Sequence, residues 1–282
     1  MKILITGANG MLARAVAKHC AAAGDDVVAL DRARLDISDA VCVDEAFETH
    51  RPDAVLNCAA YTNVDGAETE KDTAFAANAF GVENLALAAN EIGCRFLTVS
   101  TDYVFDGRNS GYYTQRDTPS PISEYGLSKL EGERLARDAY ARTIVVRSGW
   151  IFGASGTNFL SVMHKLLSEG KTIKAIKDSY GTPTYADDLA RRMRELLELD
   201  LPCVYHITNS GEGTSYLGFA EAVCEIGGFD KALLDAVSKD ELKRPAPRPA
   251  SSKLACLFSE RFGLEPLPDW KQALERYLDG KA

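Results

Sequence analysis

The sequence predicts an α/β fold in which a doubly wound parallel sheet (a Rossmann domain) is joined to a smaller lobe of mixed α/β structure. Short β-rich runs alternate with helical stretches through the first half of the 282-residue chain. A glycine-rich turn follows the first run directly, and the alternation becomes less regular after about residue 150. Alternating strands and helices are typical of βαβ units, whose parallel strands are covered by helices.

The first five expected strands are short apolar runs, which cover residues 2–6, 27–30, 54–59, 95–100 and 143–148. The first helix is expected from Met11 to Ala23, with Gly24 at its C-terminal cap. A longer helix follows Asp72 and ends at Gly93. Its apolar residues recur at helical spacing, and they are Val82, Leu85, Ala86 and Ala89.

The second half of the chain predicts the mixed lobe. We expect a helix near 157–169, a strand at 172–176, a helix from Asp187, a strand at 205–208 and mainly helices afterwards. The prolines between Arg244 and Pro249 indicate a surface connection. We therefore expect a dinucleotide-binding domain over residues 1–150 and a substrate-binding lobe over residues 151–282, with a segment of about 178–208 returning to the first domain.

Composition excludes several function classes. The net charge of −9 and the pI near 5.1 disfavour nucleic acid as a partner, because phosphate binding relies on clustered Lys and Arg. No apolar run approaches the ~18 residues that a membrane span needs. The seven cysteines are widely spread, without a C-x-x-C pair or a Cys/His cluster at zinc spacing. We expect a cytoplasmic protein with reduced cysteines, no membrane or nucleic-acid partner and no metal site.

The residues after the first strand predict a dinucleotide site. The run 2–6 leads into Gly7-Ala8-Asn9-Gly10-Met11-Leu12-Ala13 and then into a helix. Gly7 permits a tight turn, Gly10 lets the backbone approach a pyrophosphate, and the helix N-terminus offers unpaired N–H groups. Ala13 replaces the usual third glycine, whose role is the packing of helix on strand. An ordinary βα turn without a ligand is the alternative.

The end of the second strand bears on the choice of cofactor. Asp31 stands where an acid accepts hydrogen bonds from the adenosine ribose, which favours NADH. Arg32 follows it, and an arginine there can pair with the 2′-phosphate of NADPH. Asp36 and Ile37 are expected near the adenine. The cofactor is therefore NADPH or NADH, and solvated charge at a strand end is the alternative role for Asp31 and Arg32.

A predicted helix that carries Tyr125-Gly126-Leu127-Ser128-Lys129 is the candidate for acid–base chemistry. Residues four apart share one face of a helix. Hydride reduction of a carbonyl produces an alkoxide, which needs a proton from a nearby acid. Tyr, with a reference pKa of about 10, becomes effective when a cation stabilises its phenolate. Lys129 fits that role and equally fits binding of the nicotinamide ribose, while Y-x-x-x-K also occurs by chance on exposed helices.

Hydroxyl groups after the fourth apolar run strengthen this interpretation. Ser100-Thr101-Asp102 closes that run, so these side chains are expected at the carboxyl edge of the sheet, where open α/β sheets bind ligands. A hydroxyl there can donate to a substrate carbonyl oxygen and polarise it toward hydride attack. The alternatives are strand-end hydrogen bonding for Ser100 and Thr101, and capping of the next turn for Asp102.

Seven segments that cover the chain nearly end to end carry a family resemblance. They are TGANGML (6–12), NCAAYTNVDGAE (57–68), STDYVFDG (100–107), PISEYGLSKLEGE (121–133), RSGWIFG (147–153), SYGTPTYADDLA (179–190) and RPASSKL (248–254). Together they resemble the extended short-chain dehydrogenases and, among them, the dTDP-4-dehydrorhamnose reductase family. The resemblance implies hydride transfer from NAD(P)H to C4 of a nucleotide-linked keto sugar, dTDP-4-dehydro-β-L-rhamnose.

The resemblance also implies roles for single residues. Thr101, Tyr125 and Lys129 look like the catalytic three. The expected cofactor contacts are Gly7, Gly10, Met11, Leu12, Asp31, Arg32, Asp36, Ile37, Ala60, Tyr61, Thr62, Val99, Tyr125 and Lys129. The expected substrate contacts are Thr101, Asp102, Trp150, Asn158, Arg248 and Ser252, and the planar fork of the arginine suits a diphosphate.

Several of these residues have ordinary structural alternatives. Trp150 also fits a core aromatic, Asn158 a helix cap and Arg248 a surface charge. Asn78 resembles the Asn that holds a proton-relay water in short-chain dehydrogenases, and it equally fits a buried amide. Ala15 stands where some family members have a Glu that helps bind magnesium between subunits. We therefore expect a monomer or homodimer without a magnesium bridge.

Two other functions compete with the reductase. Reductase-like folds also serve as non-catalytic binding subunits, such as the β subunit of methionine adenosyltransferase, but binding alone does not require Thr101, Tyr125 and Lys129. An epimerase-reductase or a dehydratase that acts on another sugar nucleotide would need further acid–base groups. The sequence shows no second Cys/His or Glu pair beside the three.

Overall fold

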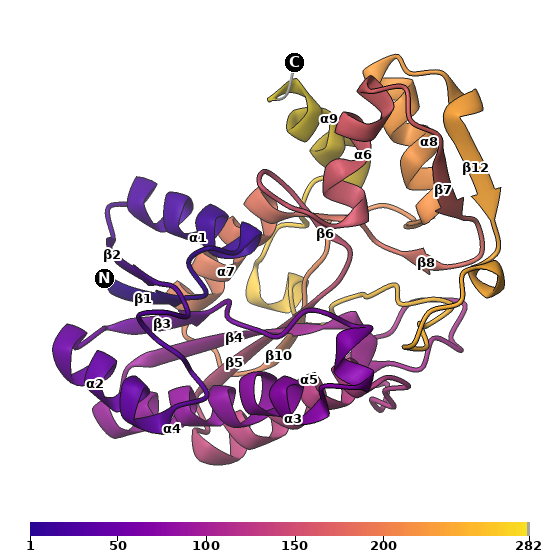
Figure 1. The fold of residues 1–282 in the computed structure, drawn as a ribbon. Helices are drawn as coiled ribbons and strands as arrows, with labels where there is room; N and C mark the ends of the chain where they lie inside the picture. Colours follow the sequence, from indigo (N-terminus) through magenta and orange to yellow (C-terminus); the bar gives the residue numbers. More distant parts are fainter. Residues whose placement is uncertain (281–282) are drawn as a thin grey trace.

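The computed structural model describes residues 1–280 and has a central sheet of six parallel strands (Figure 1). The strands lie in the order β10-β5-β4-β3-β1-β2, so the predicted doubly wound sheet is confirmed. The order reverses at β1, which pairs with both β2 and β3. Ligands of open α/β sheets bind outside the carboxyl ends of the strands at such a point. The bounds are β1 Lys2–Thr6, β2 Asp26–Leu30, β3 Ala54–Asn57, β4 Arg95–Thr101, β5 Thr143–Ser148 and β10 Val204–His206.

Helices cover both faces of this sheet, as Figure 1 shows. One face carries α1 and α7, which pack on each other, and the opposite face carries α2, α4 and α5. Separate apolar cores fill the two layers, with Val16 and Met193 in the first and Phe47 and Leu85 in the second. Strands buried on both faces are mostly apolar, which is why they are visible in the sequence. The bounds are α1 Met11–Ala22, α2 Ala40–His50, α4 Gly81–Ile92, α5 Glu124–Ala139 and α7 Ala186–Leu199.

The helix expected after Asp72 is interrupted. It begins as α3 (Lys71–Phe75), continues as a π-helical turn, η2 (Ala76–Phe80), and becomes α4, which ends at Gly93 with a φ of +70°. Single π-helical turns inside α-helices are frequent at functional sites. The π turn carries Asn78, whose side chain is fully buried. Periodicity predicted the two ends of the helix but not the turn inside it.

The second half of the chain builds the mixed lobe around a third apolar core. The expected helix and strand near 157–176 are confirmed as α6 and β7, but β12, a parallel partner of β7, was not expected. It is only four residues long and pairs with a strand about 60 residues earlier, so no local pattern marks it. The bounds are β6 Ile151–Phe152, α6 Phe159–Ser168, β7 Ile173–Ile176, β8 Tyr180–Gly181, β9 Thr184–Tyr185, β11 Thr214–Ser215, α8 Tyr216–Gly227, β12 Leu234–Val237 and α9 Trp270–Asp279.

Two parts of the second half lie against the sheet of the first. β10 pairs with β5, with Val204 beside Val145, and α7 packs on α1. The division into domains at residue 150 stays a prediction. The Pro-rich connection lies at the surface as expected at Arg244, Pro245 and Pro247, but Ala246 and Pro249 are buried. A Cβ added at Gly107 would lie 2.6 Å from Pro249, so this segment packs tightly on the loop after β4.

Short 3₁₀ helices complete the structure. They are η1 Gly66–Glu68, η3 Asp102–Val104, η4 Lys231–Leu233, η5 Lys239–Glu241 and η6 Glu260–Phe262. The first helix of the chain ends at Ala22, one residue earlier than expected, and Gly24 adopts the left-handed φ of +81° just beyond it. Within residues 1–280, no helix is both long and apolar enough to cross a membrane.

Candidate active site

A cleft of about 680 Å³ opens at the carboxyl edge of the sheet. This volume lies within the range of small-molecule and cofactor sites. The cleft is lined by residues that both halves of the chain contribute, and it gathers most of the predicted site. The predicted residues that line it are Gly10, Met11, Leu12, Ala60, Thr62, Val99, Thr101, Asp102, Tyr125, Lys129, Trp150, Asn158 and Arg248.

Seven predicted residues do not line the cleft. They are Gly7, Asp31, Arg32, Asp36, Ile37, Tyr61 and Ser252. Four of them belong to the region around the end of β2. Of the other three, Gly7 shapes the turn before α1, Tyr61 is held by the Asn78 amide, and Ser252 donates to Asp102. Ile37 is buried, and a Cβ added at Gly81 would lie 2.7 Å from its side chain, so Ile37 packs against the start of α4.

The turn between β1 and α1 forms a cradle for a pyrophosphate. Gly7 has a φ of +69°, and a Cβ there would lie 2.9 Å from the backbone of Ala59, so only glycine fits. Gly10 caps α1 without a side-chain hydrogen bond, and the first turn of α1 holds no acidic residue. The N–H groups and the positive end of the helix dipole therefore face an uncrowded space. These residues fit a dinucleotide.

The charges after β2 form two ion pairs. Asp31 accepts hydrogen bonds from the Asn9 amide at 3.1 Å and from Arg34 Nε at 3.4 Å. Although burial opposes it, these hydrogen bonds lower the pKa of Asp31 below its usual value. Arg32 pairs with Asp36 at 3.1 Å. Sequence reasoning missed Arg34, and its signal was a second basic residue three positions after Asp31.

The predicted acid–base pair lies in the first turns of α5, which begins at the N-cap Ser123. Burial raises the pKa of Tyr125 above its usual value, and a hydrogen bond with Thr101 opposes the shift. Burial lowers the pKa of Lys129 to about 8, with the negative charge of Glu133 opposing. Tyr125 is thus protonated at neutral pH and can donate a proton, while Lys129 remains mostly charged.

Lys129 is held by the neighbouring strand. Its Nζ donates to the carbonyl oxygen of Val99 at 2.7 Å, which places the ammonium group beside the end of β4. Two residues later on that strand comes Thr101, whose hydroxyl lies in the same cleft. The strand end and the helix are therefore joined at the lysine, and the three predicted catalytic residues line one cavity.

Thr101 and Asp102 form a small hydrogen-bonded group. The Thr101 hydroxyl donates to Asp102 Oδ1 at 3.0 Å and accepts from the Tyr103 N–H at 3.1 Å, so Thr101, not Asp102, caps the following turn. The Ser252 hydroxyl donates to the other oxygen of Asp102. Burial raises the pKa of Asp102 to about 6, against these hydrogen bonds. Ser252 thus reaches the cleft through Asp102.

Ser100 points to a different place from Thr101. Its hydroxyl donates to Glu133 Oε1 at 2.5 Å, so strand-end hydrogen bonding is the observed role. The Glu133 carboxylate also accepts hydrogen bonds from Arg147 Nη2 at 2.6 Å and Nε at 2.9 Å, and this ion pair is almost completely buried. Sequence reasoning missed this pair. An arginine inside an otherwise apolar β5 was the available signal.

Two of the expected substrate contacts also have the structural roles named as alternatives. Trp150 belongs to the third apolar core and stacks on Tyr216, with ring centroids 3.9 Å apart. Asn158 caps α6, since its Oδ1 accepts from the Ser161 N–H at 3.0 Å and its Nδ2 donates to the Ile151 carbonyl at 2.8 Å. Both residues nevertheless line the cleft.

Arg248 is not an isolated surface charge. Its guanidinium group pairs with both carboxylate oxygens of Asp65, at 2.5 and 2.8 Å.

The side-chain amide of Asn78 is fully hydrogen-bonded. Its Oδ1 accepts from the Tyr61 N–H at 2.9 Å, and its Nδ2 donates to the Tyr61 carbonyl at 3.0 Å and to the Ser128 hydroxyl at 3.0 Å. These contacts match the buried-amide alternative, and they hold Tyr61 in place from outside the cleft.

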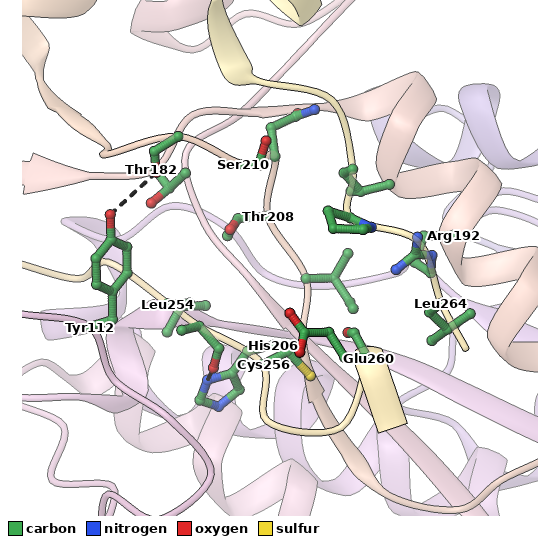
Figure 2. Close-up of a pocket in the computed structure, with 17 residues that line it drawn as sticks. Tyr112, Thr182, Arg192, His206, Thr208, Ser210, Leu254, Cys256, Glu260 and Leu264 are labelled. Carbon is green, nitrogen blue, oxygen red and sulfur yellow. Dashed lines mark hydrogen bonds between the residues drawn. The ribbon is translucent and has the colours of Figure 1, made fainter. Parts of the chain in front are cut away.

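A smaller pocket of about 270 Å³ lies where β10 ends against the C-terminal segment. Figure 2 shows His206, Thr208 and Cys256 around it, and Tyr112 at its rim donates to the Gly211 carbonyl at 3.2 Å. Thr101, Tyr125 and Lys129 do not line this pocket. Across residues 1–280, no group of three or more His, Cys, Asp or Glu side chains is arranged to hold a metal ion.

Comparison with known proteins adds independent findings. The chain matches the family described as RmlD substrate binding domain over residues 1–282. The spore coat polysaccharide biosynthesis protein SpsK of Bacillus subtilis (strain 168) is 36% identical, covering 100% of this chain and 98% of that protein. A dTDP-4-dehydrorhamnose reductase of Streptomyces griseus is 39% identical, covering 96% of this chain and 91% of that protein.

A solved structure gives the same picture in three dimensions. The dTDP-4-dehydrorhamnose reductase of Bacillus anthracis str. Ames, in complex with NADP, superposes with a TM-score of 0.95. It is 33% identical and covers 99% of this chain and 100% of its own.

Proposed function

The chain belongs to the RmlD substrate binding domain family, and we propose that it catalyses the last step of dTDP-L-rhamnose formation. It is an NAD(P)H-dependent oxidoreductase that reduces the C4 keto group of dTDP-4-dehydro-β-L-rhamnose. The observation that carries this proposal is the meeting of Thr101, Tyr125 and Lys129 in one cleft beside a dinucleotide cradle. Full-length relatives named as dTDP-4-dehydrorhamnose reductases support it.

The reaction needs a hydride donor and a proton donor. When bound, the reduced nicotinamide supplies the hydride to C4. Tyr125 supplies the proton to the developing alkoxide, because its raised pKa keeps the phenol protonated in the resting site. When substrate is bound, the Thr101 hydroxyl turns its one proton from Asp102 Oδ1 to the same oxygen, to which Tyr125 also donates, and two positioned donors stabilise the negative charge where it develops.

Lys129 has two roles in this proposal, which its position serves together. Its charge, held on the Val99 carbonyl beside the end of β4, favours the phenolate form of Tyr125 after proton transfer. Two of its three donors remain for the ribose hydroxyls of the nicotinamide half. The pKa of about 8 keeps most of the group charged at neutral pH.

The remaining contacts divide along the cleft. We assign the cofactor to the β1–α1 turn and the ends of β2 to β4, through the fourteen cofactor contacts expected from the sequence. We assign the sugar to Asp102 and Trp150, with Ser252 acting through Asp102, and the nucleotide end to Asn158 and Arg248. A cytoplasmic location and a monomer or homodimer without a magnesium bridge stay predictions.

The test is an oxidation assay with purified protein. NADPH and NADH are each offered with a small panel of 4-keto sugar nucleotides that differ in sugar and in base. We expect oxidation that depends on the keto sugar and is fastest with dTDP-4-dehydro-β-L-rhamnose. A protein that binds NADPH but oxidises it with no member of the panel would be a binding subunit, and the proposal would be wrong.

A further inference from the structure

Two residues from distant parts of the chain form an ion pair beside the cleft, and only the arginine lines it. Asp65 lies in the loop after β3, immediately before η1, and Arg248 lies in the Pro-rich segment. The Arg248 Nη1 and Nη2 atoms lie 2.5 and 2.8 Å from the two oxygens of Asp65. Asp65 Oδ1 also accepts the Ala246 N–H at 3.1 Å. The carboxylate therefore ties the late segment to the loop after β3.

Arg248 keeps two hydrogen-bond donors that its contacts within the protein do not use. A guanidinium group carries five N–H donors. Nη1 uses its two on Asp65 and on the Ala246 carbonyl at 2.8 Å, and Nη2 uses one on Asp65. Within residues 1–280, Nε–H and the second Nη2–H of Arg248 have no hydrogen-bond partner. These two donors form the adjacent edge of the guanidinium plane, and a bidentate edge matches phosphate geometry.

The location of that edge agrees with a ligand role. Arg248 lines the cleft, and its side chain is only 18% exposed. Asp65 itself does not line the cleft, so the carboxylate stands behind the arginine. Hydrogen bonding by Arg248 lowers the pKa of Asp65, which keeps the carboxylate ionised at neutral pH. A flexible arginine side chain held from behind loses little further freedom when a ligand binds its open edge.

We propose that Asp65 is a positioning residue that holds the Nη side of Arg248, so that the Nε/Nη2 edge is presented to the diphosphate of the nucleotide sugar. The inference rests on the proposed function, because it takes the ligand to be a nucleoside diphosphate sugar. Without Asp65 the arginine remains charged, but its orientation is no longer set. The loss should therefore appear in ligand affinity and not in the chemical step.

The experiment measures binding of dTDP, dTMP and thymidine to the intact protein by calorimetry, together with KM and kcat for the keto sugar. Asp65→Asn should weaken dTDP binding and raise KM by about 10- to 100-fold, the size of one charge-assisted hydrogen bond. The change in kcat should stay within threefold, and thymidine binding should not change. Asp65→Asn added to Arg248→Gln should cause no further loss, since the two act as one unit.

A matched control removes an aspartate from another arginine. Asp138 pairs with Arg134 at 2.7 Å on the exposed side of α5, and Asp138→Asn should leave dTDP binding and KM unchanged. NADPH binding and the thermal midpoint report on the fold of each variant. If Asp65→Asn weakens the binding of thymidine and NADPH as much as that of dTDP, or fails to fold, then Asp65 has only a structural role and the inference is overturned.

Unchanged dTDP binding in Asp65→Asn, or losses that simply add in the double variant, would overturn it as well. The proposed function is tested separately by the wild-type protein. If the wild type binds dTDP in an Asp65-dependent way but reduces no keto sugar, the proposed reaction is wrong while the role of Asp65 stands.

Discussion

Glu133→Gln removes one charge from the buried pair that joins β4, β5 and α5. The Glu133 and Arg147 side chains are 5% and 7% exposed, and three short hydrogen bonds from Ser100 and Arg147 converge on the carboxylate. After the change the guanidinium group stays charged inside the protein. His206 Nε2 lies 3.4 Å away, and burial and then Arg147 lower the pKa of His206 to about 4, so its ring is neutral and does not compensate the positive charge.

The expected cost follows from these contacts. Removing one partner of a buried ion pair destabilises a protein by about 3–5 kcal/mol, since the other charge is left without compensation. The Phe105 ring, 5.3 Å from the Arg147 guanidinium, offers only a weak cation–π contact in return. For a chain of this size the loss corresponds to a fall of the thermal midpoint of roughly 6–20 °C.

The helix provides its own control two residues away. Glu131 pairs with Arg134 at 2.6 Å, but their side chains are 34% and 55% exposed. Glu131→Gln should therefore cost no more than about 1 kcal/mol. Thermal and urea unfolding of the two variants, followed by circular dichroism, gives the comparison. Equal losses for Glu133→Gln and Glu131→Gln, or a loss below about 1 kcal/mol for the former, would refute the reasoning.

Tyr125→Phe should lower kcat by about 10²- to 10⁴-fold with little change in cofactor affinity, and a variant within threefold of the wild type would remove the tyrosine from the mechanism. Because Lys129 is charged below its pKa of about 8 and neutral above it, kcat/KM for the cofactor should fall as the pH rises through about 8. That fall should be missing in Lys129→Met, and its persistence would assign it to another group. Asp31→Ala should lower the affinity for NADH about 10- to 100-fold more than the affinity for NADPH, and Arg32→Ala should do the opposite. Equal losses for both cofactors would mean that neither side chain contacts the 2′ position of the adenosine ribose. Exhaustive EDTA treatment should leave turnover and molar mass unchanged, and loss of both with recovery on adding magnesium would contradict the inference from Ala15.

Much of the sheet and of the central cleft was predictable, because their signals are local. Strands buried on both faces are continuous apolar runs, and a glycine turn between strand and helix marks the dinucleotide cradle. Thr101 closes one such run, while Tyr125 and Lys129 share a helix face. Parallel strands end at the same edge, so these groups could be expected to meet.

The parts that escaped prediction depend on contacts between distant residues. Asp65 and Arg248 lie 183 positions apart, and no local sequence pattern around either residue predicts that they pair. Ser100 and Thr101 both end β4, yet alternate residues of a strand face opposite ways, so the Ser100 hydroxyl bonds to Glu133 while the Thr101 hydroxyl bonds to Asp102. The π turn at Asn78 likewise needs tertiary contacts, because helical periodicity continues through it.

Transfer of a labelled hydride tests the central claim most directly. The wild-type protein is incubated with dTDP-4-dehydro-β-L-rhamnose and NADPH that carries deuterium at C4 of the nicotinamide on one defined face. The product is then examined by NMR and mass spectrometry. We predict dTDP-L-rhamnose with the deuterium on C4 of the sugar when the correct face is labelled, and no product from Tyr125→Phe beyond a trace. Oxidation of the cofactor without deuterium in the sugar, or a product reduced at another carbon, would contradict the account.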